Sequence, residues 1–217
     1  KKGIGRWIFD HLGKSPVLMS SVNGETRAKV ATNLLHDYGY FNGTVSYQEV
    51  PQKNPKEAKV NYVIDMAQPY FLDSIAYLRY PHYADSLIQS TRSQSVLKSE
   101  ENFNVLKLEE ERQRLSNLFR NHGYYYYRPE FTTYRADTLQ KSGYVSLQVV
   151  PRNGIPTEAK KQYYVGNTSV YLTGYNNEPP TDTLRLRTMT LYYSGKKPGI
   201  RPNALMRNVF FRKGELF

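Results

Sequence analysis

The sequence predicts an α+β fold of tandem modules, each ordered strand-helix-helix-strand-strand with a three-stranded mixed sheet packed on two helices. Three observations support this prediction. A motif repeats at an offset of 84 residues, each copy follows a stretch with helical periodicity, and each copy precedes two strand-like stretches. The length of 217 residues is enough for two or three such modules.

The repeated motif is a glycine followed by aromatic residues. Residues 31–41 read ATNLLHDYGYF and residues 115–125 read LSNLFRNHGYY, which places Gly39 and Gly123 at equivalent positions. Before each glycine, residues recur at i, i+3, i+4 and i+7, the spacing of one helix face. A glycine adopts the left-handed conformation at low cost, so we expect each helix to end there. Asn104 is a candidate cap for the start of the second helix.

Two strands follow each helix. In the first copy they cover residues 45–50 and 59–65, and in the second copy they cover 130–136 and 144–150. Polar segments rich in turn-forming residues separate the two members of each pair. We therefore expect two hairpins.

The four consecutive tyrosines at 124–127 allow two interpretations. As the start of a strand they would alternate, with Tyr124 and Tyr126 on one face and Tyr125 and Tyr127 on the other. One pair would then cover the helix that has just ended. The alternative is a platform of rings on which bases or sugars stack.

The remaining elements define the first two modules. Residues 70–80 have the aromatic and β-branched content of a strand, and 82–97 are interpreted as a short helix. A complete module is therefore expected at 68–151. A module at 1–67, with a helix near 4–12, is expected to lack its first strand.

A third module is expected at 152–217, truncated before its own glycine motif. It begins with a strand within 161–174, continues with a strand-like stretch at 183–193 and has a helix start within 200–211. The segment 176–183 is interpreted as an insertion into this module. We interpret the whole chain as a piece of a longer protein.

Composition limits the class of protein. Hydrophobic residues make up 39% and charged residues 23%, which is typical of a folded chain. The net charge of +11 is compatible with nucleic acid, an anionic membrane surface or acidic partners. There is no cysteine, which excludes disulfides, thiolate metal sites and cysteine nucleophiles.

No motif in the sequence indicates catalysis. None of the four histidines has the spacing of a metal site. The carboxylates of EEER at 109–112 are expected on a solvated helix face, paired with Arg112 and Arg114. We predict a protein that is not an enzyme and needs no cofactor or metal.

The chain resembles POTRA domains, the polypeptide-transport-associated modules of BamA/TamA-like outer-membrane β-barrel assembly proteins (the bacterial surface antigen family). The resemblance rests on LLHDYGYFNGTVSYQEV, VNYVIDMAQPYFLDSIAY and NFNVLKLEEERQRLSNLFRNHGYYYYRPEFTTY, with weaker likeness over 152–199. The residues that match the module motif, and for which it implies a structural role, are Gly39, Tyr40, Phe41, Gly123, Tyr124 and Tyr125.

The resemblance implies a location and a role. The modules would lie on the periplasmic side of the outer membrane of a Gram-negative bacterium, followed in the parent protein by a membrane β-barrel. They would receive unfolded outer-membrane polypeptides or assembly accessory proteins and pass them to the barrel.

In the predicted module the second strand lies at a sheet edge, where its unpaired backbone groups can bind an extended peptide. The candidate docking residues are Thr44, Val45, Ser46, Tyr47, Gln48 and Glu49 in the first module, and Glu130, Phe131, Thr132, Thr133 and Tyr134 in the second. Pro129 removes one donor near the second edge, so the first is predicted to be the better one.

Several alternatives stay open at this point. The same modules occur in two-partner secretion transporters and in cell-division scaffolds. The basic charge and the 20 tyrosines would also suit an RNA-binding module, but no RNP-type motif is present and we expect no nucleic acid. An anionic membrane surface is a further candidate partner for the basic residues.

Overall fold

The computed structural model describes residues 18, 21–54, 57–173, 179–210 and 212–217, and the helix expected near 4–12 lies outside them. Its helices are α2 (Gly24–Asp37), α3 (His82–Ser90), α4 (Val105–Arg120) and α5 (Pro202–Asn208), with 3-10 turns η2 (Arg92–Gln94), η3 (Pro129–Phe131) and η4 (Thr157–Lys160). Its strands are β1 (Thr44–Pro51), β2 (Ala58–Asp65), β3 (Phe71–Tyr77), β4 (Thr132–Asp137), β5 (Tyr144–Pro151), β6 (Ser169–Tyr171), β7 (Asp182–Arg185) and β8 (Thr190–Tyr193).

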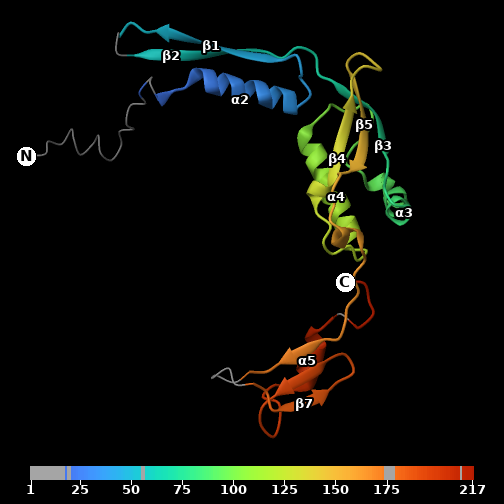
Figure 1. Ribbon diagram of the computed structural model, residues 1–217. Helices are drawn as coiled ribbons and strands as arrows, with labels where there is room; N and C mark the ends of the chain where they lie inside the picture. Colours follow the sequence, from blue (N-terminus) through green and yellow to red (C-terminus); the bar gives the residue numbers. More distant parts are fainter. Residues whose placement is uncertain (1–17, 19–20, 55–56, 174–178, 211) are drawn as a thin grey trace, which may run out of the picture. The chain divides into compact units, whose positions relative to one another are not determined.

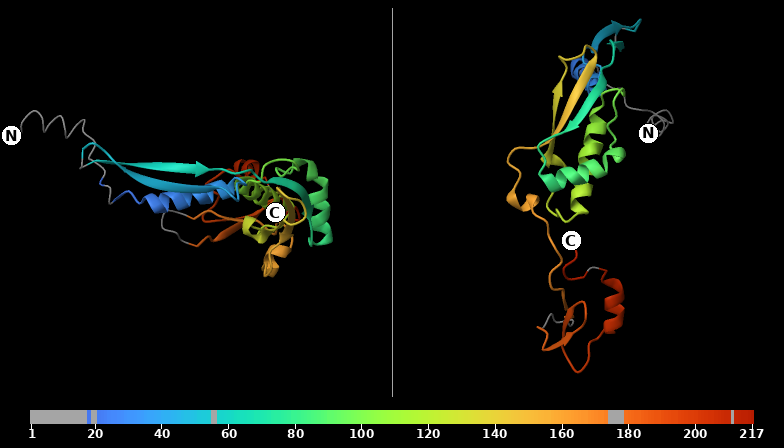
Figure 2. Two further views of the ribbon diagram at one scale, coloured as in Figure 1. Left: turned by 90° about the horizontal axis from the view of Figure 1, so that it is seen from above. Right: turned by 90° about the vertical axis from the view of Figure 1, so that its right-hand side faces the viewer.

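The strand orders confirm the predicted fold class. Described strands form three sheets, ordered β1-β2, β3-β5-β4 and β6-β8-β7. In the middle sheet the first strand pairs with the last, and the second strand, β4, lies at an edge, as the strand-helix-helix-strand-strand order predicts. Figure 2 shows this sheet with α3 and α4 on one of its faces.

The chain divides into two compact units. One consists of Lys1–Asp73, Ser99–Leu106 and Thr138–Ser146, and the other of Ser74–Lys98, Lys107–Asp137 and Leu147–Phe217. The module boundaries expected from the sequence, at 67/68 and 151/152, stay predictions.

In the first unit, α2 lies along the β1–β2 ribbon (Figure 1). The helix begins after Asn23, whose Oδ1 accepts a hydrogen bond from the N–H of Thr26 at 3.0 Å. It ends before Gly39, which has a φ of 89°. This left-handed conformation favours glycine and explains why the helix stops where the sequence predicts.

In the second unit, apolar side chains of α3, α4 and β5 form the core. The exposed fraction is at most 1% for each of Ile88, Leu115, Phe119, Leu147 and Val149. Leu115 and Phe119 follow the predicted periodicity of α4. Asn104 caps that helix as expected, with Oδ1 accepting from the N–H of Leu106 at 2.8 Å.

The tyrosine run forms a tight turn, and its interpretation as the start of a strand is wrong. The N–H of Tyr127 donates to the carbonyl of Tyr124 at 2.9 Å, and Gly43 and Tyr40 make the same 2.9 Å bond in the first copy. The helix end leaves unpaired carbonyls that these turns satisfy: the N–H of Tyr124 donates to the carbonyl of Phe119 at 3.0 Å.

The turn therefore separates the rings differently from a strand. Tyr124 and Tyr127 contact Phe119, with ring centroids 5.9 Å and 4.6 Å away. Tyr125 and Tyr126, in the middle of the turn, are 41% and 48% exposed. Two rings cover the helix as expected, but they are the outer pair of the four.

Beyond each glycine the chain forms the same junction with a later segment. The carbonyl of Gly39 accepts from the N–H of Tyr70 at 2.9 Å, and the carbonyl of Tyr70 accepts from the N–H of Phe103 at 2.9 Å. The Phe41 ring lies 5.0 Å from the ring of Tyr70 and 5.0 Å from that of Phe103. A Cβ on Gly39 would lie 2.8 Å from the carbonyl oxygen of Phe103, so the junction requires glycine.

The second junction repeats these backbone contacts. The carbonyl of Gly123 accepts from the N–H of Tyr163 at 2.7 Å, and the carbonyl of Tyr163 accepts from the N–H of Phe217 at 3.0 Å. The Tyr125 ring lies 4.7 Å from that of Phe217. Gly123 has a φ of 85°, and a Cβ there would lie 2.7 Å from Cδ2 of Leu216. The predicted repeat is thus present in the backbone contacts as well as in the sequence.

The third part of the chain carries a hairpin where the middle module has a short link. Residues 78–81 connect β3 to α3, whereas residues 172–201 connect β6 to α5 and include β7 and β8. The single strand-like stretch predicted at 183–193 is therefore two strands. The N–H of Leu186 donates to the carbonyl of Met189 at 2.9 Å and closes the turn between them.

Candidate functional site

The outer edge of β1 presents backbone groups that no described strand pairs with. The N–H of Val45 points away from β2 and donates to Oγ1 of Thr32 in α2 at 3.0 Å. In an antiparallel pair, the N–H and C=O of one residue point to the same side, and the side alternates along the strand. The backbone groups of Tyr47 and Glu49 therefore also face away from β2.

A groove of about 430 Å³ lies between α2 and this edge. It is lined by Glu25, Ala28, Lys29, Thr32 and Asn33 of α2 and by Val45, Ser46 and Tyr47 of β1. The ring of Tyr47 lies against the start of α2, where a Cβ on Gly24 would be 2.5 Å from Cδ2 of the ring. The absence of a side chain at Gly24 allows this close approach.

An ion pair lies on the α2 side of the groove. Nζ of Lys29 is 2.6 Å from Oε1 of Glu25, and both side chains are exposed. Their hydrogen bond lowers the pKa of Glu25 and raises the pKa of Lys29. Because water screens the pair, it contributes little to stability and leaves both charges available to a bound chain.

The second candidate edge, β4, begins later than the sequence predicts. Pro129–Phe131 form η3 and the strand begins at Thr132, so the strand start expected at Glu130 is wrong. Proline favours this turn because its ring fixes φ. The carbonyl of Phe131 accepts from the N–H of Arg152 at 2.8 Å. Docking at these residues stays a prediction.

Side chains of α4 and β4 contact each other beside this second strand. Oη of Tyr134 donates to the carbonyl of Leu108 at 2.6 Å. The guanidinium of Arg112 lies 5.2 Å from the centroid of the Tyr134 ring. Burial raises the pKa of Tyr134.

Residues of α2 correspond to the residues of α4 that lie 84 positions later in the sequence. Leu108 corresponds to Gly24, and Arg112 corresponds to Ala28. Tyr134 lies against Leu108 as Tyr47 lies against Gly24. The side chain of Arg112 thus lies over the Tyr134 ring of β4, whereas the small side chain of Ala28 leaves the groove beside β1 open. A comparison of the two repeats would have shown this difference, which the sequence prediction missed.

Glu111 is fully buried, which contradicts the expected solvated face. Its carboxylate accepts hydrogen bonds from Oη of Tyr77 at 2.5 Å, from Val96 N–H at 3.1 Å and from Arg114 Nε at 2.9 Å. Glu111 shares the helix face of Leu108 and Leu115, and that spacing was the missed signal. The expected pairings are confirmed: Arg114 pairs with Glu111, and the half-buried Arg112 pairs with the exposed Glu109.

The described residues offer no cluster of three or more His, Cys, Asp or Glu side chains for a metal ion. Every helix in this part of the chain is too short or too polar to cross a bilayer.

No protein-family model matches the sequence, and no curated protein matches it. Among solved structures, POTRA domains 3–5 of Haemophilus influenzae BamA share 8% identity with the chain, with a TM-score of 0.41, over 89% of this chain and 63% of that one. For BamA from Haemophilus ducreyi lacking POTRA domains 1–3, the identity is 14%, the TM-score 0.39, and the coverage 64% and 24%. POTRA1-3 of Omp85 from Anabaena shares 15% identity with the chain, with a TM-score of 0.29, over 89% of this chain and 65% of that one.

The first and third of these structures are POTRA domains, and the second is a BamA that lacks POTRA domains 1–3. The chain spans 63% of the length of the first and 24% of the second. Since the TM-scores are below 0.5, these likenesses bear on neither partners nor mechanism.

Proposed function

We propose that this chain is the periplasmic polypeptide-binding region of an outer-membrane protein assembly factor. It receives unfolded outer-membrane polypeptides or accessory proteins by β-strand addition and passes them to a membrane β-barrel that follows in the parent protein. The role is non-catalytic. The observation that carries the proposal is the open groove between α2 and β1, next to an edge of β1 where the backbone groups of Tyr47 and Glu49 face away from β2.

An extended peptide fits this groove as a further strand. Its backbone would pair with the N–H and C=O groups of Tyr47 and Glu49, while alternate side chains would enter the space above Ala28. Pairing through the backbone tolerates many sequences, which suits a receptor for unfolded chains.

The expected affinity is low. Four backbone hydrogen bonds, each worth about 1 kcal/mol net, give a Kd on the order of millimolar before any side chain is buried. A weak complex releases its client readily, which a hand-over to a barrel requires.

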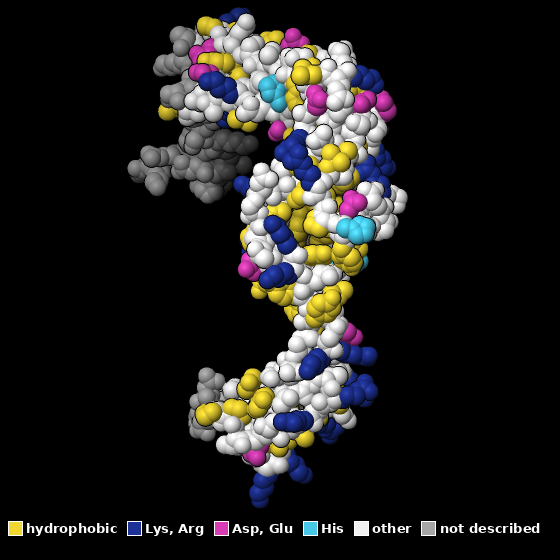
Figure 3. All heavy atoms as spheres, turned by 45° about the vertical axis from the view of Figure 1, so that its right-hand side comes forward, with side chains coloured by type: hydrophobic (Ala, Val, Ile, Leu, Met, Phe, Trp, Pro, Cys, Tyr) yellow, Lys and Arg dark blue, Asp and Glu magenta, His cyan; other side chains and the backbone are white. Residues whose placement is uncertain are grey.

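The third part of the chain provides a separate, electrostatic contact with an anionic partner. Residues 152–217 contain eleven Lys and Arg but four Asp and Glu. Among the described residues of this part, no ion pair neutralises a cation. Figure 3 shows their side chains spread over the surface. Near phospholipid headgroups, each such cation would contribute about 1 kcal/mol.

A titration with a peptide copied from one strand of a membrane β-barrel tests the groove. We expect the backbone amide resonances of 24–33 and 44–51 to shift most. Shifts confined to other parts of the chain would contradict strand addition at β1.

Binding of the basic part, residues 152–217, is tested with vesicles containing anionic lipid, against vesicles of neutral lipid alone.

A further inference from the structure

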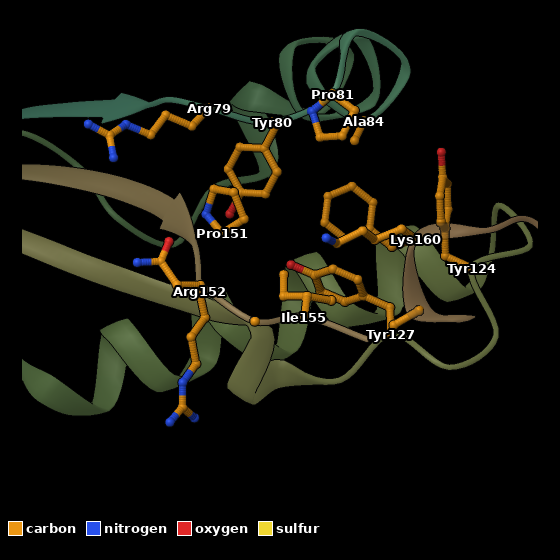
Figure 4. Close-up of a pocket in the computed structure, with 14 residues that line it drawn as sticks. Arg79, Tyr80, Pro81, Ala84, Tyr124, Tyr127, Pro151, Arg152, Ile155 and Lys160 are labelled. Atoms are coloured by element: carbon orange, nitrogen blue, oxygen red, sulfur yellow. The ribbon is translucent and has the colours of Figure 1, made fainter. Parts of the chain in front are cut away.

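A second cavity, which shares no residue with the β1 groove, lies in the second unit. Its volume is about 390 Å³, within the ~300–1,000 Å³ range of ligand sites. The start of α3, the end of α4, the tyrosine turn and the chain after β5 surround it (Figure 4). Four rings line it, those of Tyr80, Phe119, Tyr124 and Tyr127.

The walls of this cavity are mostly apolar and already packed. Phe119 and Ala159 are each 1% exposed, and Tyr127 and Ile155 are 8% and 9% exposed. The rings of Phe119 and Tyr127 meet edge to face, with centroids 4.6 Å apart. Such preformed aromatic walls favour an aromatic or aliphatic group, because binding it requires little rearrangement.

The charged residues that line the cavity are all cations, namely Arg79, Arg152 and Lys160. None of the three forms an ion pair with a described residue. Figure 4 shows the Arg79 and Arg152 side chains pointing away from the cavity. These two charges would therefore contact groups on either side of an apolar group bound in the cavity, and not that group itself.

Arg79 also has an unusual backbone conformation. Its φ is 65°, in the left-handed region that costs a residue with a Cβ about 1 kcal/mol or more. A glycine would adopt this conformation freely. Strained residues of this kind concentrate at functional sites, where a side chain is needed despite the cost.

We infer that this cavity binds one aromatic or aliphatic side chain of an extended, acidic polypeptide. The apolar anchor enters between the rings, and acidic residues before and after it lie beside the cations of the rim. The inference rests on the proposed function, since it names a second contact for the polypeptides that the chain receives. An extended polypeptide fits better than a single amphiphile because the arginine charges point outward.

The test uses the 217-residue chain and a fluorescent nine-residue peptide of glycine and aspartate with one central phenylalanine. Glycine and aspartate disfavour strands, so this probe does not suit the β1 groove. In anisotropy titrations, replacing the phenylalanine of the peptide by alanine should weaken binding at least about tenfold. Replacing its aspartates by lysine should also weaken it.

Three protein variants locate the site. Ala84→Leu occupies the cavity and should abolish binding. Lys160→Glu should weaken binding by up to about fivefold, whereas Lys161→Glu, an equal charge change at a neighbour outside the lining, should not. Arg79→Gly should weaken binding without lowering thermal stability, so misfolding cannot explain its effect.

Equal binding of the phenylalanine and alanine peptides, or equal losses in the two lysine variants, would overturn the inference. Displacement of the peptide by sodium dodecanoate, with the same loss in Ala84→Leu, would assign the cavity to a lipid chain and overturn it as well. If this peptide fails to bind while a barrel-strand peptide still protects the amides of Tyr47 and Glu49, the proposed function stands and the second contact does not.

Discussion

The strands β1 and β4 follow the same glycine motif in their modules, but the helix beside each strand presents a different side chain to it. Next to β1, Ala28 leaves a groove of about 430 Å³ open to an incoming chain. Next to β4, the corresponding residue is Arg112, whose guanidinium lies 5.2 Å from the Tyr134 ring. One position of the repeat thus distinguishes a strand beside an open groove from a strand whose tyrosine ring lies under an arginine.

This difference shows that a shared fold does not make the two edges equivalent. The backbone pattern of the module creates the edge, and one side chain on the neighbouring helix decides whether a peptide can reach it. Variants that displace α4, or that change the side chains at positions 28 and 112, test whether these two residues cause the difference.

Glu111→Ala should have the largest effect, because it removes the partner of Arg114 and Tyr77 inside the protein. Breaking a buried ion pair on one side costs about 3–5 kcal/mol of unfolding free energy. Urea denaturation measures this loss. The control, Glu110→Ala at an exposed position of the same helix, should change the free energy by less than about 0.5 kcal/mol. A loss below about 1 kcal/mol for Glu111→Ala would show that this network does not hold α4.

Alkaline pH should weaken the same region. Burial, together with the hydrogen bond to Glu111, raises the pKa of Tyr77 from 10.0 to about 12. Between these values the unfolded chain loses a proton that the folded chain keeps. The unfolding free energy should therefore fall by up to about 1.4 kcal/mol per pH unit from this group. Below pH 10 its contribution is fully present.

Urea denaturation between pH 9 and 12 measures this slope. Tyr80 and Tyr134 add to it in the same direction, because burial raises the pKa of each. Tyr77→Phe should reduce the fall of the unfolding free energy per pH unit by the contribution of this one tyrosine. An unchanged slope in this variant would contradict the assignment to Tyr77.

Ala28→Arg should close the β1 groove by giving α2 the side chain that α4 has. We expect the affinity for a barrel-strand peptide to fall at least about tenfold, or 1.4 kcal/mol, because the bound chain must displace the new side chain. Val30→Arg is the matched control, since it adds the same charge at an exposed position of α2 that does not line the groove. Equal losses in both variants would indicate a charge effect and not a closed groove.

Arg112→Ala should have the smallest effect, a gain of weak peptide binding at β4. The arginine side chain is 32% exposed, so we expect its removal to cost about 1 kcal/mol of stability or less. Amide exchange of β4 residues with and without the peptide measures the gain. Glu109→Ala breaks the ion pair but keeps the arginine, and it should leave β4 covered.

Much of this fold could be predicted because it depends on local signals. Gly39 and Gly123 end their helices at positive φ, and the residue pattern before them is helical. The tyrosine turn was missed because aromatic residues also favour strands, and the hydrogen bonds that close a helix end decide between the two. Amino-acid composition predicted one strand at 183–193, and it likewise could not show the turn that the hydrogen bond between Leu186 and Met189 closes.

The candidate site was predicted in part. Strand order alone places β1 and β4 at edges, so the edges could be named from the sequence. Which edge is open depends on Ala28 and Arg112, which lie far from the strands in sequence and matter only once the helix packs beside them. The burial of Glu111 likewise depends on Tyr77 and Val96, which approach it through the fold.

Amide hydrogen exchange along β1, with and without saturating barrel-strand peptide, tests the central claim most directly. The amides of Tyr47 and Glu49 face away from β2, so they should exchange quickly in the free chain and slowly in the complex. Ser46 and Gln48 already pair with β2, so their amides should be slow in both. If the peptide binds and the amides of Tyr47 and Glu49 stay unprotected, strand addition at this edge is contradicted.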